Sequence, residues 1–470
     1  MIRALVFPCA TGVGQEIFAA LEHHKDVELW GVNSGEAGSN VGSFLFRGRY
    51  LGGAPPMRDE ASCLSWICDV VAAKKIDCIF PAYDDAQVWL KAREGALGGA
   101  LVVTSPVATT DVCRSKKRTY ALLANVLRCP ASYALPDSVP DEAFPVFIKP
   151  ECGEGGKGCF KVSSRQELGA LLTEEHIICE YLPGDEYTVD CFTASARQLQ
   201  FVGARRRTLT RAGISILTES VDDADGRFHA MAAAINGALE LVGAWFFQVK
   251  HALNGELCLM EIAPRIPGAM ALHRAMGVNF PLLSLYVHLG RPVAVMLPPL
   301  RRVACCKIYA NHFAVSPLGE AHAALAAVYV DLDDTLLMHA GHPLLCAGNA
   351  SSAGVTASAH WPNPGVASLL FEAKAACIPV HLITRHAGEV RRTLEDACIH
   401  AAIFASVVHV TRAEEAKSSY IRERPAALLD DSFRERADAN LAGILAFDVD
   451  SLELLRDLIR STARARAAKF

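Results

Sequence analysis

The sequence of 470 residues has no uninterrupted apolar run near the roughly 20 residues that a helix needs to cross a bilayer. The closest approach, residues 230–247, is interrupted by Asn236 and Glu240. The first apolar stretch, residues 4–7, stops at Pro8, too early for a secretion signal. We therefore expect a cytoplasmic protein that has no membrane partner.

Charge of one sign is also in small excess, because the formal net charge is −5. The absence of a large basic field argues against nucleic acid as a partner. The 16 cysteines form no Cys-x-x-Cys pair and no zinc-like Cys/His cluster. Most of them, such as Cys78 and Cys191, lie within apolar runs, where a thiol behaves as a small hydrophobe. This pattern predicts a reducing environment and no disulfide framework.

The length predicts two or three domains, and the 51% hydrophobic content is ample for their cores. Residues 1–110 alternate short apolar strands with helical patterns, which predicts α/β organisation around a parallel sheet. We expect strands at residues 4–7, 27–32, 78–80 and 101–104. After the first strand comes Thr11-Gly12-Val13-Gly14-Gln15, half of a dinucleotide fingerprint, because Ile17 replaces the third glycine. We favour a tight strand-to-helix turn there over nucleotide binding.

Residues 111–316 mix strands and helices and contain a phosphate-binding pattern. Residues 144–150 form a predicted strand with Lys149 at its end, and the glycine-rich stretch 153–158 follows at once. Backbone amides of such a loop can cradle phosphates while a lysine approaches them. The loop is not a P-loop, because no Ser or Thr follows Lys157.

Two predicted strand pairs follow in the same region. Residues 177–190 are typical of strand, turn and strand, and residues 246–250 and 257–262 predict a hairpin around Asn254-Gly255. The oxygen-bearing side chains of Gln248 and Glu261 would then face one metal ion from neighbouring strands.

This series, over roughly the first 310 residues, resembles the ATP-grasp enzymes of the carboxylate–amine ligase superfamily, specifically the short single-copy form of the carbamoyl-phosphate synthase large subunit. The resemblance implies a Rossmann-like domain over residues 1–110 and an ATP-grasp domain over residues 111–316. It implies ATP as cofactor with Mg²⁺, and Mn²⁺ as an alternative ion. By this resemblance, Lys149 would bind the α-phosphate of ATP and the glycine loop would bind the β- and γ-phosphates. Residues 180–182 would line the adenine pocket, and Glu186 would bind the ribose. The residues that the resemblance assigns to ATP are Lys116, Lys149, Gly155, Gly156, Glu180, Tyr181, Leu182, Glu186 and Arg265, and its metal ligands are Gln248 and Glu261.

Two features of this region leave alternatives open. The family usually reads Glu-x-Asn-Pro-Arg, with the asparagine on Mg²⁺, whereas this chain has Ala263, whose methyl group cannot bind a metal. The run Arg205-Arg206-Arg207 is typical of a solvated charged surface. Arg211 falls where the family binds its reacting groups, so Arg207 and Arg211 are equally candidates for substrate binding.

The last third carries a second constellation. An apolar strand ends at Asp331-Leu332-Asp333, and side chains at i and i+2 share one face of a strand. Asp331 would attack a phosphorus atom, and Asp333 would act as acid and then base. Two anions cannot attack a phosphate dianion unaided, so a divalent cation is implied. Thr384 at a later strand end, Lys417, and Asp430 would supply a hydroxyl, a cation and a further Mg²⁺ ligand.

This order resembles the haloacid dehalogenase-like (HAD) phosphohydrolases. We place a linker at residues 317–326 and the HAD-like domain, a doubly wound parallel sheet, at residues 327–470. The implied metal ligands are Asp331, Asp333 and Asp430. About forty residues separate Thr335 from Ile378, which leaves little room for a cap.

Together these patterns predict a bifunctional enzyme, an ATP- and Mg²⁺-dependent carboxylate–amine ligase joined to a phosphatase. The expected partners are a small-molecule carboxylate, an amine and a phosphorylated metabolite, and a homodimer is left open. Two alternatives remain. Ala263 would mark an ATP-binding regulatory domain beside an active phosphatase, or the synthetase would act on a small acid such as carbamate.

Overall fold

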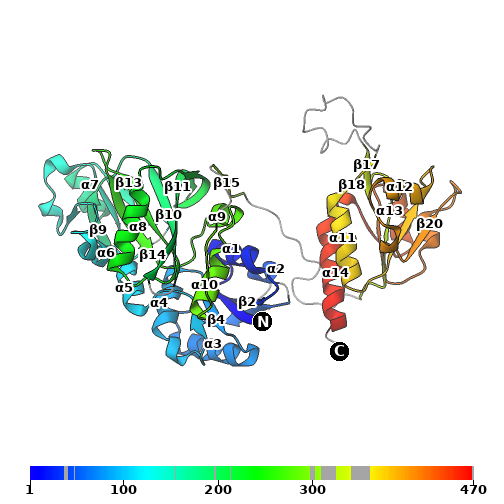
Figure 1. Cartoon of the computed structure of the whole chain (residues 1–470), viewed down its shortest axis with the longest axis horizontal. Coiled ribbons are helices and arrows are strands. Elements are labelled where there is room, and N and C mark those ends of the chain that lie inside the picture. Colours follow the sequence, from blue (N-terminus) through cyan, green and yellow to red (C-terminus); the bar gives the residue numbers. More distant parts are fainter. Residues whose placement is uncertain are drawn as a thin grey trace. The chain divides into compact units, whose positions relative to one another are not determined.

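The chain divides into two compact units, Met1–Ala310 and Asn311–Phe470 (Figure 1). The computed structural model describes residues 1–35, 41–46, 48–153, 155–194, 197–211, 213–296, 302–308, 324–339 and 360–467. Most of the predicted linker, residues 317–323, lies outside the described residues, as do Glu154 of the glycine loop and residues 340–359. The predicted domain boundaries therefore stay predictions.

The first unit begins with a five-stranded parallel sheet of order β3-β2-β1-β4-β5. Its strands are β1 (Ile2–Phe7), β2 (Val27–Ser34), β3 (Tyr50–Ala54), β4 (Cys78–Pro81) and β5 (Leu101–Val102). Its helices are α1 (Gly12–Leu21), α2 (Gly42–Leu45), α3 (Glu60–Lys74), α4 (Asp84–Ala92) and α5 (Val107–Arg114). The parallel α/β prediction is confirmed. We did not predict β3, because it contains two adjacent glycines, which are depleted in strands.

The turn from β1 into α1 is tight, as expected. The Thr11 side chain caps the helix by accepting from the Gly14 backbone N–H at 2.9 Å, and its hydroxyl donates to the Ala82 carbonyl at 2.9 Å. A Cβ atom on Gly14 would lie 2.3 Å from the Cys9 carbonyl oxygen. Glycine is required at residue 14 because the helix starts against the preceding backbone.

Two antiparallel sheets complete the first unit. The smaller has the order β6-β9-β7-β8 and the larger β14-β13-β10-β11-β12-β15. The smaller contains β6 (Ser132–Tyr133), β7 (Val146–Pro150), β8 (Phe160–Val162) and β9 (His176–Glu180), with α6 (Lys116–Leu123) and α7 (Arg165–Leu171) beside it in sequence. The larger contains β10 (Glu186–Thr193), β11 (Leu199–Arg211), β12 (Ile214–Val221), β13 (Gly243–His251), β14 (Leu257–Ala263) and β15 (Ala304–Cys306).

Helices cover one face of the larger sheet. The helices that follow its strands are α8 (Arg227–Ala238), α9 (Ala271–Ala275) and α10 (Phe280–His288). Phe228 and Ile235 of α8 pack against Val189 of β10 and Phe247 of β13 in one buried cluster. The opposite face is thereby left for polar side chains. The predicted hairpin of β13 and β14 is confirmed, and Gln248 lies directly opposite Glu261.

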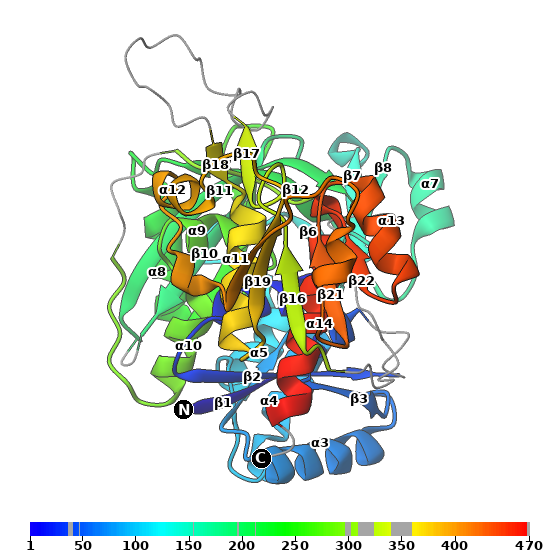
Figure 2. The ribbon, with the colours of Figure 1, turned by 90° about the vertical axis from the view of Figure 1, so that its right-hand side faces the viewer.

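The second unit is a doubly wound parallel sheet of order β20-β19-β16-β21-β22 (Figure 2). Its strands are β16 (Ala327–Val330), β19 (Val380–Thr384), β20 (Ser406–His409), β21 (Ala426–Leu429) and β22 (Leu445–Phe447), and its helices are α11 (Pro364–Ala375), α12 (Val390–Asp396), α13 (Phe433–Leu441) and α14 (Leu452–Ala467). Val328 and Val330 of β16 pack into the cluster with α11 and α14, while Ala327 and Tyr329 pack into the cluster with α13. Both faces are buried, which explains the continuous apolar strands.

The interval in which we expected little cap contains two strands that we did not predict. These are β17 (Leu337–His339) and β18 (His360–Pro362), which pair antiparallel. Within the part of the chain that the structure describes, no helix combines the length and the hydrophobicity that crossing a membrane demands.

A pair of glycine substitutions tests the turn at the start of α1. Gly14→Ala should destabilise the first unit by about 1–3 kcal/mol, because its Cβ has no space beside Cys9. Gly237→Ala, within α8 and with nothing within 4 Å of its Cβ position, should leave stability unchanged or raise it by up to about 1 kcal/mol. Scanning calorimetry of both variants would measure the difference. Equal melting temperatures would contradict the predicted close approach.

Candidate functional site

The first unit contains a cavity of about 600 Å³ on the polar face of the larger sheet. Of the residues predicted from sequence, those that line it are Lys116, Lys149, Gly155, Gly156, Glu186, Arg207, Gln248, Glu261 and Arg265. A smaller hollow of about 40 Å³ is lined by Glu180, Tyr181 and Leu182 together with Lys149. Arg211 is exposed at the end of β11 and is not among the residues that line the cavity. The structure thus brings together side chains from β7, α6 and four strands of the larger sheet.

Lys149 lies at the end of β7 and is 7% exposed. Its Nζ donates to the Tyr120 hydroxyl at 2.7 Å, and that hydroxyl donates to the Met260 carbonyl at 2.6 Å. Burial lowers the pKa of Lys149 from its ordinary value, and the neighbouring Lys116 lowers it further. An anion beside Lys149 would reverse that cost, so the site favours a negatively charged ligand.

Lys116 and the glycine loop meet at one point. Lys116 begins α6, and its Nζ donates to the Gly153 carbonyl at 3.1 Å. Gly155 and Gly156 have φ angles of 61° and 67°, which favour glycine. A Cβ on Gly213, in the turn between β11 and β12, would lie 2.2 Å from the Gly155 carbonyl carbon. The loop is therefore seated against that turn.

Glu180, predicted to contact adenine, and Glu186, predicted to contact ribose, already have ionic partners. The Arg128 guanidinium donates to both Glu180 oxygens at 2.8 and 2.9 Å. Glu186 forms ion pairs with Arg207 at 3.1 Å and with Lys250 at 3.9 Å. A ribose hydroxyl would share the Glu186 carboxylate with these cations.

Gln248 and Glu261 fit a magnesium ion by their chemistry. They are directly paired across β13 and β14, both line the cavity, and both offer the oxygen ligands that Mg²⁺ takes. Ala263 lies two residues beyond Glu261, opposite Phe246, and is 7% exposed. Its methyl group supplies no ligand, so the protein offers two oxygen-bearing side chains there.

Arg265 is bound by Asp84, the first residue of α4. Its Nε and NH2 donate to the two Asp84 oxygens at 2.8 and 2.7 Å, and its NH1 donates to the Ile266 carbonyl at 3.2 Å. The predicted phosphate contact stays a prediction, and it requires a ligand to share the guanidinium with Asp84.

The three consecutive arginines of β11 differ in burial. Arg206 is exposed and pairs with Asp185 at 3.0 Å, which fits the expected charged surface. The Arg207 side chain is only 6% exposed and donates to the Gly213 carbonyl at 2.5 Å. Burial lowers the pKa of Arg207, and Glu186 opposes that shift.

Arg205 is 3% exposed, lines the cavity and is bound to Asp190. We missed Arg205, since only the strand register shows that it faces inward.

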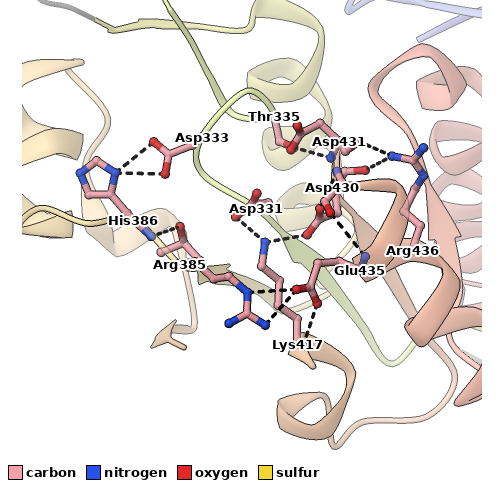
Figure 3. Close-up of polar contacts among 12 residues, drawn as sticks. Asp331, Asp333, Thr335, Arg385, His386, Lys417, Asp430, Asp431, Glu435 and Arg436 are labelled. Carbon is pink, nitrogen blue, oxygen red and sulfur yellow. Dashed lines mark hydrogen bonds and ion pairs between the residues drawn. The ribbon is translucent and has the colours of Figure 1, made fainter. Parts of the chain in front are cut away.

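The second unit gathers acidic side chains at the carboxyl ends of β16 and β21 (Figure 3). One oxygen each of Asp331, Asp430 and Asp431 lie within 4.8 Å of one another. The Lys417 Nζ lies between two of them, 2.8 Å from Asp331 and 2.7 Å from Asp430. Three hard oxygen donors this close fit Mg²⁺.

The charges of this cluster are largely buried. Burial raises the pKa of Asp331 to about 7, although Lys417 opposes the shift. Burial also raises the pKa of Asp430. Burial lowers the pKa of Lys417, but the two carboxylates outweigh it and raise the pKa above its ordinary value. The ammonium group therefore stays charged and offsets the repulsion between the two anions.

The structure differs from the predicted metal set at Asp333. Its carboxylate accepts from His386 Nδ1 at 3.0 and 3.1 Å, outside the carboxylate cluster, and Asp431 joins the cluster instead (Figure 3). The reason is local: β16 ends at Val330, and the chain turns through Asp334, whose φ is 56°. Alternation between i and i+2 holds only while the strand continues.

Thr384 and Lys417 lie where the pattern predicted. Thr384 ends β19, is fully buried, and accepts from the His386 backbone N–H at 3.0 Å. Lys417 begins a short 3₁₀ turn, and its backbone N–H donates to Glu435 at 2.9 Å. Arg385 donates to the same Glu435 at 3.0 Å. We missed Glu435, although an acidic residue in the first turn after the capping Ser432 is a recognisable signal.

Residues 173–307 match the family model described as ATP-grasp in the biosynthetic pathway with Ter operon. The first unit carries an ATP-grasp fold. No curated protein matches the chain.

Three solved structures illustrate the likeness of fold. A biotin carboxylase domain dimer of Hydrogenobacter thermophilus 2-oxoglutarate carboxylase, with MgADP, ADP and bicarbonate, has TM-score 0.55 and 12% identity over 65% of this chain and 74% of its own. An L-amino acid ligase from Bacillus licheniformis has TM-score 0.51 and 17% identity over 64% and 78%. An N5-carboxyaminoimidazole synthetase from Staphylococcus aureus, complexed with ADP, has TM-score 0.52 and 13% identity over 65% and 82%.

The predicted ATP-grasp domain is thus confirmed, whereas the carbamoyl-phosphate synthase branch stays a prediction. The family model ends at residue 307, so it does not bear on the second unit. The HAD-like assignment of residues 327–470 also stays a prediction, although the doubly wound parallel sheet itself is present.

Removing the Lys417 ammonium should destabilise the second unit. Lys417→Met leaves Asp331 and Asp430 buried without their cation, which should cost about 3–5 kcal/mol near pH 8 in a metal chelator. When folding raises the pKa of a carboxyl group, the free energy of unfolding increases as pH falls. The destabilisation caused by Lys417→Met should therefore become smaller toward pH 6. Lys374→Met, which removes an exposed donor to the Ala402 carbonyl, is the control. Urea unfolding that shows equal, pH-independent losses for both variants would contradict the prediction.

Proposed function

We propose that the ATP-grasp unit is an ATP- and Mg²⁺-dependent carboxylate–amine ligase. The observation that carries the proposal is one cavity whose lining includes Lys116 and Lys149, a glycine loop and a Gln–Glu pair. Lysines and loop amides suit the phosphates of a nucleotide, and the Gln–Glu pair suits a divalent cation. The likeness in fold to an L-amino acid ligase supports this class of reaction.

In this proposal each group has one task. Lys149, held by Tyr120, and Lys116 bind the phosphates under the glycine loop, and residues 180–182 receive the adenine in the smaller hollow. Gln248 and Glu261 would hold Mg²⁺, which supplies neutralising charge at the transferred phosphoryl group. Arg207 and Arg211 are the proposed ligands of the reacting groups.

The reaction needs positioning rather than a protein nucleophile. An oxygen of the substrate carboxylate attacks the γ-phosphorus, the bond to ADP breaks, and an acyl phosphate forms. The amine nitrogen then attacks the acyl carbon, phosphate leaves, and the nitrogen loses a proton. A screen of carboxylates and amines for stimulated ADP release, with hydroxylamine as trap, tests the proposal. An acyl hydroxamate supports it.

Two alternatives to the ligase remain, and Ala263 favours the first of them. A unit that binds ATP without turnover would show no ADP release with any acid, and it would then be a regulatory module. A carbamoyl-phosphate-type synthetase would respond to a small acid without an organic carboxylate. The same screen separates the three readings.

Lys149 is the most direct test of nucleotide binding. Lys149→Ala should weaken ATP binding about ten- to a hundredfold, because a charge-assisted phosphate contact contributes about 1.5–3 kcal/mol. Calorimetric titration of ATP with Mg²⁺ measures the change, and Lys25→Ala, at an exposed residue, is the control. Unchanged ATP affinity in Lys149→Ala would remove this lysine from the site.

We further propose that the second unit is a Mg²⁺-dependent phosphohydrolase of the HAD type. The cluster of Asp331, Asp430 and Asp431 with Lys417, at the carboxyl ends of parallel strands, favours it. An Asp331 oxygen would attack the phosphorus as the bond from phosphorus to the ester oxygen breaks, and that oxygen would take a proton from Asp333 and leave as an alcohol. Water, deprotonated by Asp333, would then hydrolyse the aspartyl-phosphate.

The other residues serve this reaction by position. Mg²⁺ bound by Asp331, Asp430 and Asp431 would supply charge that lets a carboxylate approach a phosphate dianion. Thr384 is the proposed donor to a phosphate oxygen. The His386 ring lies between Asp333 and Thr393: its Nδ1 is 3.0 Å from the Asp333 carboxylate, and its Nε2 is 2.8 Å from the Thr393 hydroxyl.

Asp331→Asn should abolish Mg²⁺-dependent hydrolysis of p-nitrophenyl phosphate. Replacing the attacking oxygen with an amide should raise the barrier by several kcal/mol, a loss of about 10³-fold or more. Asp396→Asn, at an exposed position of α12, should retain full activity. Activity of Asp331→Asn equal to that of the control would refute the assignment of the nucleophile.

A further inference from the structure

Four cavity-lining side chains form one row across the larger sheet. Arg205 of β11 lies opposite Thr188 of β10, Thr188 lies opposite Gln248 of β13, and Gln248 lies opposite Glu261 of β14. All four line the same cavity. Neighbouring strands are about 4.8 Å apart, so Thr188 and Arg205 lie one and two strand spacings beyond the Gln–Glu pair.

Thr188 and Arg205, the two members of this row on β10 and β11, have unused hydrogen-bonding groups. Thr188 is 1% exposed and Arg205 is 3% exposed. Within the described residues, the Thr188 hydroxyl and the Arg205 NH1 have no hydrogen-bond partner. A buried donor without a partner is costly, and two at directly paired positions beside a cavity indicate a ligand that accepts from both.

The Arg205 guanidinium is fixed in one orientation. Its Nε and NH2 donate to Asp190 at 2.8 and 3.3 Å, and Asp190 is fully buried. His273 Nδ1 lies 2.9 Å from the same carboxylate. Burial opposes ionisation of Asp190, yet Arg205 and His273 lower its pKa. Asp190 and His273 are therefore positioning residues, and NH1 is the nitrogen that they leave unused.

The neighbouring arginines of the strand are bound differently. Arg206 lies on the exposed side and pairs with Asp185. Arg207 donates to the Gly213 carbonyl, and its Nε, which also has no hydrogen-bond partner within the described residues, lies 3.1 Å from the Glu186 carboxylate. Arg205 therefore differs from its neighbours in that a fully buried carboxylate accepts from two of its nitrogens.

We propose that Thr188 and Arg205 form the subsite for the carboxylate that accepts the phosphoryl group. The proposal rests on the ligase function proposed above. One carboxylate oxygen would accept from the Thr188 hydroxyl and the other from the Arg205 NH1. This subsite lies beyond the Gln–Glu pair, a position that fits the phosphoryl acceptor rather than ATP. The reason is that the attacking oxygen and the leaving ADP lie on opposite sides of the phosphorus.

Two conservative variants test the subsite without emptying the core. Thr188→Val removes the hydroxyl at nearly constant shape, and Arg205→Lys keeps a cation beside Asp190 while removing the forked guanidinium. The matched controls are Thr208→Val and Arg206→Lys, both at exposed positions of β11. All four changes are made in the full chain.

With an acid found by the ADP-release screen, each test variant should raise the KM for that acid about ten- to a hundredfold. The affinity for a non-hydrolysable ATP analogue with Mg²⁺ should stay within about twofold of wild type, as in the controls. An unchanged KM for the acid would overturn the proposal. An equal loss of analogue affinity would also overturn it, because the pair would then bind the phosphates of ATP.

A binding measurement keeps the proposal testable when no acid stimulates ADP release. Inorganic phosphate, titrated into the MgADP-loaded protein by calorimetry, serves as the oxyanion probe. Binding by wild type and the controls, with at least about tenfold weaker binding by both test variants, supports the subsite. Equal binding by all proteins, or no binding by wild type, overturns it. Failure of the ligase proposal has a different signature: loss of phosphate binding in the variants, but no acid-dependent turnover.

Discussion

The pairing of β10 with β11 on one side and with β13 on the other determines which side chains face the cavity of the ATP-grasp unit. Because strand side chains alternate, a shift of one residue in β10 would turn Glu186 and Thr188 away and bring Tyr187 and Val189 into the cavity. Val189 instead packs with Phe228 of α8. The apolar contacts on the helix side therefore fix the register that arranges the polar side.

Buried ions are balanced locally in both units. Asp190, fully buried, has Arg205 and His273 as partners, and Lys417 lies between Asp331 and Asp430. Such arrangements are expensive to desolvate, and stability alone is a weak reason for a fold to contain them. They fix the orientation of charged groups before a ligand arrives, which is what the phosphoryl transfers that we propose would require.

The two units present their functional groups by different geometries. In the ATP-grasp unit, cross-strand neighbours of an antiparallel sheet form a continuous row, from Arg205 to Glu261. In the second unit, side chains follow the carboxyl ends of parallel strands, where Asp331, Thr384 and Asp430 converge. The first geometry suits an extended ligand such as a nucleotide with its acceptor, and the second suits a compact anion such as a single phosphate group.

The sequence by itself determined the elements whose signals are local. A lysine at a strand end, a glycine loop and a hairpin turn identified Lys149, Gly155 and the facing pair of Gln248 and Glu261. Apolar strands that end in polar residues likewise placed Asp331, Thr384 and Asp430. Each of these follows from the residue type and its immediate neighbours. Weak or interrupted signals, as in β3 and β17, gave no prediction.

Only the tertiary structure decided how distant groups are paired. Arg265 is bound to Asp84, 181 residues away, and Asp190 to His273, 83 residues away. The exchange of Asp333 for Asp431 depends on where β16 ends and on how β21 lies beside it. Burial and ion pairing arise from contacts between separate segments of the chain. Sequence spacing therefore identified the candidate groups, and the packing of the sheets selected which of them meet.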